Sequence, residues 1–101
     1  KMEIRKSKDI NFAFTCYQGN IIATPNELVK VFGENTHGVS GDNKIKRQWV
    51  LEFTHENGKT IATIYDWKTD CIGDDEQYDW HIGGFDSDAV DCVIKYFIEN
   101  I

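Results

Sequence analysis

The chain has 101 residues, of which 41% are hydrophobic and 13% aromatic, so we expect one domain over residues 1–101 with its own core rather than a disordered segment. No apolar run approaches about 18 residues, so the sequence predicts no transmembrane helix and no membrane partner. The formal net charge of −6 points to an acidic protein and argues against direct binding of nucleic acid.

The acidic residues are concentrated in one part of the chain. Eight of them lie between Asp70 and Asp91, where there is no Lys or Arg, whereas the other residues carry 11 basic and nine acidic side chains. This segment would repel nucleic acid and attract a basic surface. The three cysteines form no C-x-x-C pair, which favours a reduced, cytoplasmic protein, with one disulfide and one free thiol as the alternative. The basic N-terminal residues precede no apolar stretch, so no signal peptide is expected.

The first predicted elements are two strands and a helix. Apolar residues recur at every second position over 10–17, which predicts a strand, and a short second strand is expected over 20–23. The run Thr24-Pro25-Asn26-Glu27 then predicts a helix, because it supplies an N-cap, a proline in the first turn and a capping box. Gly33 is a natural helix end, so this helix should cover about residues 25–32.

A β-hairpin is predicted next, with strands at about residues 47–54 and 60–67. Asn57-Gly58 lies between two alternating apolar runs and tolerates the positive φ that tight hairpin turns require. A two-residue Asn-Gly turn would pair Glu56 with Lys59, and would place Ala62 and Ile64 on the face of the first strand's aromatic residues.

A three-residue loop would instead leave Gly58 left-handed in a bulge and pair His55 with Lys59. We favour this register because it gathers the largest side chains on one face: Trp49, Leu51, Phe53, Ile61, Tyr65 and Trp67.

The remaining elements are a short strand and a long helix. The strand is expected at residues 78–82, broken by Gly83-Gly84, and the helix at about 88–100, capped by Ser87 or Asp86. The predicted class is therefore α+β: a mostly antiparallel sheet of four to five strands around a central hairpin, packed by two helices. The predicted order is strand-strand-helix-strand-strand-strand-helix.

Several short motifs follow one another over more than half of the chain. They are V-F-G at 31–33, the Gly38…Gly41-Asp42 loop, W-V-L-E-F at 49–53, A-T-I-Y-D-W-K at 62–68, W-H-I-G-G at 80–84 and A-V at 89–90. In these motifs the chain resembles a group of small, largely uncharacterised proteins of bacteriophages and large DNA viruses. The resemblance implies a viral accessory protein and supplies no catalytic residues.

The clearest candidate site combines Asp66 and His81, an acid and an imidazole expected at the ends of neighbouring strands. With the bare backbone of two glycines beside them, they could form a site for a small molecule or a peptide. The alternative is an Asp–His hydrogen bond at a strand end, with the glycines in a tight turn. The whole candidate ligand-binding set is Trp49, Tyr65, Asp66, Trp67, Trp80, His81, Gly83 and Gly84.

Other kinds of site find little support in the sequence. The spacing of His37, His55 and His81 matches no metal-ligand pattern, and we expect neither a metal nor a cofactor. Ser40 lies in H-G-V-S-G, which differs from the nucleophile elbow G-x-S-x-G, so no catalytic residue is assigned.

We therefore expect first a non-catalytic viral accessory factor that binds a host or viral protein, in particular one with a basic surface. Its protein-binding residues would be Asp70, Asp74, Asp75, Glu76 and Asp79. The alternatives are a protein that binds or sequesters a nucleotide-like small molecule in an aromatic pocket, and a small enzyme that uses Asp66 and His81. A homodimer, formed through exposed aromatic residues or an open edge strand, is compatible with all three.

Overall fold

The computed structural model describes residues 2–101. Within them, five antiparallel strands form one sheet and two helices pack against it, which confirms the α+β class. The elements in chain order are β1 (Glu3–Lys6), β2 (Cys16–Ala23), α1 (Pro25–Phe32), β3 (Gln48–His55), β4 (Gly58–Tyr65), β5 (Tyr78–Gly84) and α2 (Asp88–Asn100). No helix among the described residues is both long and apolar enough to cross a membrane.

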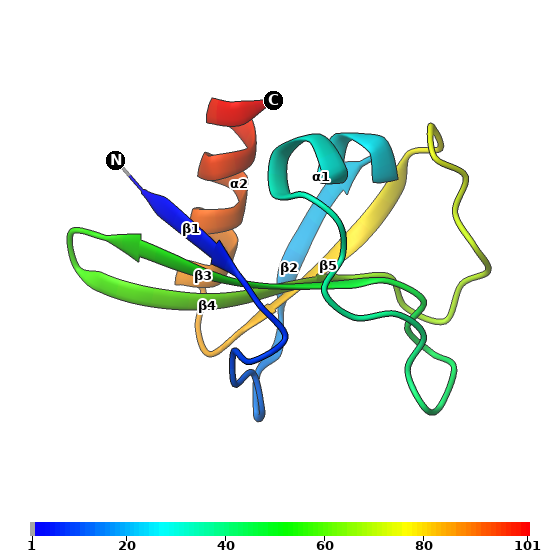
Figure 1. The fold of residues 1–101 in the computed structure, drawn as a ribbon, viewed down its shortest axis with the longest axis horizontal. Helices are drawn as coiled ribbons and strands as arrows, with labels where there is room; N and C mark the ends of the chain where they lie inside the picture. The colour runs from blue at the N-terminus through cyan, green and yellow to red at the C-terminus, as the bar shows by residue number, and fades with distance from the viewer. Residues whose placement is uncertain (1) are drawn as a thin grey trace.

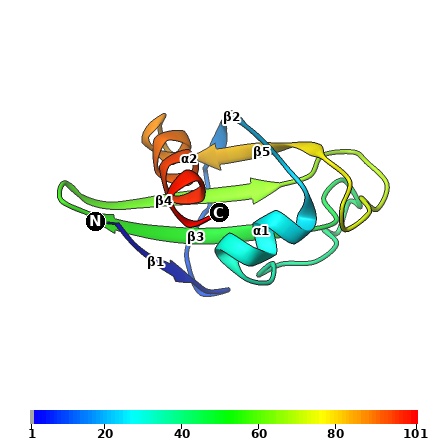
Figure 2. The ribbon, with the colours of Figure 1, turned by 90° about the horizontal axis from the view of Figure 1, so that it is seen from above.

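The strand order in the sheet is β1-β3-β4-β5-β2, so the first two strands of the chain lie at opposite edges. Both helices lie on one face of the sheet, above the β3–β4 hairpin in Figure 1. Figure 2 shows β1, β3, β4 and β5 side by side beneath them. Residues 7–15 connect the two edge strands and pass across the face that has no helix. We call this second face the open face.

Helix α1 forms where its sequence signals place it. The Thr24 hydroxyl accepts a hydrogen bond from Glu27 N at 3.1 Å, and the Glu27 carboxylate accepts one from Thr24 N at 2.9 Å, which is the predicted capping box. At the other end, Gly33 has a φ of 80° and its N–H donates to the Val29 carbonyl at 2.8 Å. Leu28 and Phe32 are thereby turned into the core.

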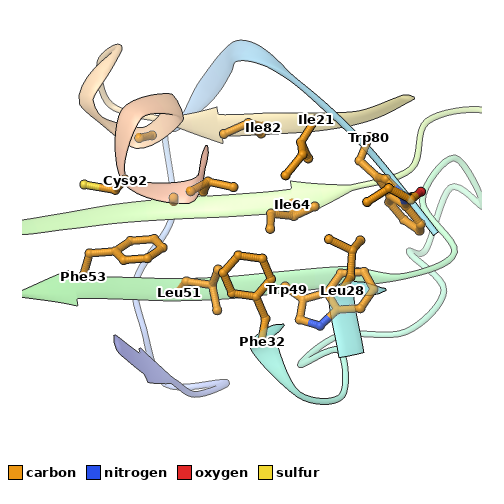
Figure 3. Close-up of a cluster of buried hydrophobic side chains, with 14 residues drawn as sticks. Ile21, Leu28, Phe32, Trp49, Leu51, Phe53, Ile64, Trp80, Ile82 and Cys92 are labelled. Carbon is orange, nitrogen blue, oxygen red and sulfur yellow. The ribbon is translucent and has the colours of Figure 1, made fainter. Parts of the chain in front are cut away.

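The core lies between the helices and the sheet, as Figure 3 shows. Trp49 of β3 and Trp80 of β5 are fully buried there and meet edge to face, with their ring centroids 5.5 Å apart. Each indole N–H has a backbone carbonyl as its partner: Trp49 donates to Gly33 O at 2.7 Å and Trp80 to Ala23 O at 2.9 Å. Because both N–H groups are satisfied, the two rings contribute apolar burial without the penalty of an unpaired polar group.

The hairpin differs from the favoured register. Its strands pair His55 with Gly58 and Trp49 with Ile64, so the two turn residues are Glu56 and Asn57 and the bulged register is wrong. Gly58 does have a positive φ of 124°. The observed pairing places Ala62 and Ile64 on the core face and turns Ile61 and Tyr65 to the open face. The observed register buries the aliphatic side chains of Ala62 and Ile64 under the helices. This burial favours it over the register that would gather the aromatic residues on one face.

The first strand lies elsewhere than predicted. Residues 10–15 form no strand: Phe14 has a φ of 69° and is 95% exposed, while Ile10 is buried. The edge strand is β1, where Ile4 packs against the core and Arg5 forms an ion pair with Glu52 at 3.2 Å. The alternation of apolar residues over 10–17 predicted a strand there. Most of this stretch instead connects the two edge strands of the sheet, so it does not pair as a strand.

Gly83 and Gly84 do not break a strand; both are buried inside β5. A Cβ atom on Gly84 would overlap the Ala89 methyl group of α2, so the missing side chain lets the helix approach the sheet. A Cβ atom on Gly83 would lie 2.6 Å from Thr63 Oγ1 on the open face. The two glycines are therefore contact points on opposite faces of β5 rather than turn residues.

Candidate functional site

The sheet divides the predicted ligand-binding residues between its two faces. Trp49 and Trp80 lie in the core under the helices, fully buried, and cannot contact a ligand without unfolding. Tyr65 and His81 point to the open face, because side chains alternate along β4 and β5. The predicted aromatic pocket is therefore not a single cluster, and its accessible part is smaller than expected.

Four rings form a continuous row on the open face, which we call the aromatic row: Tyr17, His81, Tyr65 and Trp67. His81 and Tyr65 are Cα partners on neighbouring strands and their rings stack, with centroids 5.4 Å apart and planes at 25°. Tyr17 meets His81 edge-on at 5.1 Å, and Trp67 meets Tyr65 edge-on at 6.3 Å. The planes of the two outer rings are thus nearly perpendicular to the planes of the central rings that they meet.

Gly83 makes room for this arrangement. It is the Cα partner of Tyr17 in β2, and a Cβ atom built on it would lie 3.3 Å from Cε1 of the Tyr65 ring. The Tyr17 hydroxyl is held by a hydrogen bond to the Asn20 side chain on the same strand. No local signal in the sequence links Tyr17 to the site, because only the pairing of β2 with β5 brings it next to His81.

The four rings line a concavity of about 260 Å³. Trp67 lies just beyond the end of β4 and is 40% exposed, and its backbone N–H donates to the Tyr78 hydroxyl at 3.3 Å. Two ammonium groups lie near its ring, Lys44 at 5.8 Å and Lys68 at 5.7 Å from the centroid. A backbone hydrogen bond of 2.7 Å from Lys68 N to Lys44 O joins the two loops that carry them. The Trp67 end of the row is therefore positively charged in an otherwise acidic protein.

Two polar groups of the row have distinct environments. Burial first, and then the neighbouring Tyr17 and Cys16, raise the pKa of the Tyr65 phenol above its ordinary 10.0, so it stays neutral and can donate a hydrogen bond. His81 Nδ1 is buried and has no hydrogen-bond partner among residues 2–101. An unpaired buried nitrogen is costly unless a ligand or a water molecule pairs with it.

Asp66 is buried but serves the loop before β3. Its Oδ1 accepts hydrogen bonds from the backbone amides of Lys46 at 2.7 Å and Arg47 at 3.2 Å. This oxygen therefore holds the residues that lead into β3, and no hydrogen bond joins Asp66 to His81 among the described residues. The arrangement offers no acid–base pair to a substrate.

The acidic residues proposed for protein binding lie on the connection from β4 to β5 and at the start of β5, and all five are exposed. Part of this connection rests on α1: Asp75 accepts from the Asn26 side chain at 2.8 Å, and the Asp74 carbonyl accepts from Asn26 N at 3.0 Å. The Glu76 carboxylate accepts from Gly73 N at 3.0 Å. The Asp70 and Asp79 side chains form no hydrogen bond or ion pair within residues 2–101, so they present their charge to solvent.

A second concavity, of about 330 Å³, lies between the hairpin turn and the start of α2 and was not predicted. Met2, His55 and Asp88 line it, together with Cys92, and no sequence motif links these residues. Burial raises the pKa of the Cys92 thiol, which is therefore protonated and weakly nucleophilic at neutral pH. Among residues 2–101, no three His, Cys, Asp or Glu side chains are arranged to hold a metal ion.

All three cysteines are free thiols, Cys16 and Cys71 exposed and Cys92 buried. The open-face concavity is the better candidate site, since four aromatic rings line it and two cations lie near its Trp67 end. Comparison of the chain with protein-family models, with curated proteins and with solved structures found no match.

Proposed function

We propose that this protein is a non-catalytic binding protein whose aromatic row takes the planar ring of a nucleotide-like ligand. The observation that carries the proposal is the convergence of Tyr17, Tyr65, Trp67 and His81 on one concavity with a positively charged end. Aromatic surface with a few convergent polar groups is typical of small-molecule sites. This reading develops the second of the functions expected from the sequence.

The size of the concavity limits what can enter. Its volume of about 260 Å³ is below the roughly 300–1,000 Å³ of sites for drug-sized ligands, so one ring system fits and the rest of the ligand must lie outside. A negatively charged group of that outer part would lie near Lys44 and Lys68. Stacking of a base on aromatic side chains contributes about 1–3 kcal/mol, which by itself corresponds to a dissociation constant weaker than about 1 mM. We therefore expect weak binding, in which the contact of an anionic group with Lys44 and Lys68 supplies the part of the affinity that brings the dissociation constant to about 1 mM or below.

The test is a titration with a purine nucleoside monophosphate and with the matching nucleoside. Trp49 and Trp80 are shielded in the core, so quenching of the intrinsic fluorescence reports mainly on Trp67. We expect the monophosphate to bind more tightly than the nucleoside because only it can use the two lysines. A flat response to purine and pyrimidine nucleotides at millimolar concentration would refute the proposal.

A matched pair of histidine variants separates the site from general effects. We expect His81→Ala to weaken binding at least tenfold by calorimetry, because it removes one ring of the central pair. His55→Ala changes the same residue type at the hairpin turn, beside the other concavity, and should leave the dissociation constant unchanged. Equal losses in both variants would show that the effect does not come from the row.

A second candidate function is favoured by the exposed charges of Asp70, Asp74 and Asp79. These side chains lie in the segment that has eight acidic residues and no Lys or Arg, which supports electrostatic capture of a basic protein. A viral accessory factor would use this surface, and a viral origin stays a prediction from the resemblance in the motifs. The enzyme alternative gains no support, because the buried Asp66 carboxylate is bound to backbone amides.

Affinity capture from host-cell lysate at low and moderate salt tests this second function. The bait is compared with a variant in which Asp70, Asp74 and Asp79 are reversed to Lys, since these side chains form no hydrogen bond that the change would break. A basic protein that is captured at low salt and lost in the variant would support the candidate. Capture that is insensitive to both salt and charge reversal would argue against it.

A further inference from the structure

The two edges of the sheet differ in how well they are protected against pairing with another strand. The β1 edge has only four residues, three of them charged, and Arg5 is paired with Glu52. Short length and charge are the usual devices that prevent edge-to-edge association. The β2 edge has eight residues, C-Y-Q-G-N-I-I-A, with no charged residue and no proline. No strand among residues 2–101 pairs with its outer side.

Exposed apolar side chains gather at this same edge. Ile22 is 65% exposed and Tyr17 is 56% exposed on β2 itself. Phe14 precedes the strand by two residues, and Phe85 follows Gly84, which is the Cα partner of Cys16. Phe14 and Phe85 are both exposed. Half of the eight large hydrophobic side chains exposed among the described residues therefore lie in β2 or at its ends.

We propose that β2 is a dimerisation strand that pairs antiparallel with β2 of a second copy of this chain. The occupant is a second copy because its edge has the matching properties: unpaired backbone groups, the exposed side chain of Ile22 and no charge. The net charge of −6 opposes association of two copies, and β2 is an edge that adds no like charges of its own to the contact.

The geometry of β2 limits the pairing to its second half. The register with β5 shifts between Tyr17 and Gly19, so the regular part of the strand is Gly19–Ala23. Antiparallel pairing of identical strands requires a two-fold axis perpendicular to the sheet. Such an axis keeps the helices of both copies on one side and both open faces on the other. The two aromatic rows would then lie on one continuous face of a ten-stranded sheet, twice the five strands of one copy.

The test is sedimentation equilibrium over a wide range of protein concentration, with two variants of matched exposure. Ile22→Lys places a charge on the β2 edge, and Ile98→Lys makes the same change on α2, where Ile98 is 67% exposed. We expect the wild type to dimerise, Ile22→Lys to raise the dissociation constant of the dimer at least tenfold, and Ile98→Lys to leave it unchanged. Circular dichroism checks that each variant is folded.

Hydrogen exchange of the wild type provides a measurement that needs no variant. We expect amides of Gly19–Ala23 to become more protected as the protein concentration rises, while β1 amides do not change. A wild type that is monomeric throughout the range would overturn the proposal. So would a dimer that Ile22→Lys leaves intact, or one that protects β1 instead.

Discussion

The packing of α2 on β5 predicts how Gly84→Ala changes the free energy of unfolding. Gly84 as a turn residue and Gly84 as a contact point for α2 predict changes of opposite sign. If this glycine formed a tight turn without a positive φ, Gly84→Ala would stabilise the protein by about 0.4–1 kcal/mol, because alanine restricts the unfolded chain. In the structure, a Cβ atom on Gly84 overlaps the Ala89 methyl group and lies 3.3 Å from the Ile61 carbonyl oxygen and 3.5 Å from that of Asp86. None of these atoms can rotate away, since a Cβ atom and two backbone oxygens surround the site.

The expected cost follows from overpacking. Insertion of a methyl group into a packed core typically destabilises by about 1–3 kcal/mol, and the unfolded-state gain offsets about 0.4–1 kcal/mol of that. We therefore expect Gly84→Ala to lower the free energy of unfolding by roughly 0.5–2.5 kcal/mol. For a domain of this length, each 1 kcal/mol corresponds to a fall in Tm of about 4–8 °C.

The assay is urea unfolding followed by tryptophan fluorescence, with Gly41→Ala as the control. Nothing lies within 4 Å of a Cβ atom on Gly41, which is exposed in the loop before β3, so this variant should be neutral or slightly stabilised. The double variant Gly84→Ala/Ala89→Gly removes the overlap and should be more stable than the sum of the two single changes implies. A Gly84→Ala protein at least as stable as the wild type would refute the close approach of α2 to β5.

Three further predictions concern single side chains. Asp66→Ala leaves the Lys46 and Arg47 amides without their acceptor and should lower the free energy of unfolding by about 1–3 kcal/mol, measured in urea. Asp66→Asn keeps an acceptor oxygen and should lower it less. Equal losses in the two variants would contradict this role of Asp66. Because the folded state raises the pKa of Tyr65, its contribution to stability is fully present below pH 10.0 and is lost as the pH rises through the folded pKa. The free energy of unfolding should therefore fall as the pH rises above 10.0, and less steeply in Tyr65→Phe. An identical slope in the variant would count against the shift. A thiol reagent should react quickly with Cys16 and Cys71 in the folded protein, and with Cys92 only when the protein unfolds. Fast reaction of all three cysteines in the folded protein would contradict the burial of Cys92.

Local signals in the sequence were sufficient where a few neighbouring residues decide the structure. The capping box at Thr24 and Glu27 and the stop at Gly33 placed α1 over Pro25–Phe32, and the alternating runs around Asn57-Gly58 placed the hairpin. The final helix was also placed where it lies. In each case the hydrogen bonds or the turn geometry involve residues close in the chain, so the information is local.

Long-range pairing decided the rest, including the candidate site. Whether Tyr65 faces the core or the open face depends on the hairpin register, and burial of Ala62 and Ile64 under the helices selects that register. Tyr17 joins His81 only because β2 lies beside β5 at the far edge of the sheet, 64 positions away along the chain. The same strand order makes β2 an open edge. A single sequence carries no local signal for these contacts, because the free energy that selects them comes from packing between segments distant in the chain.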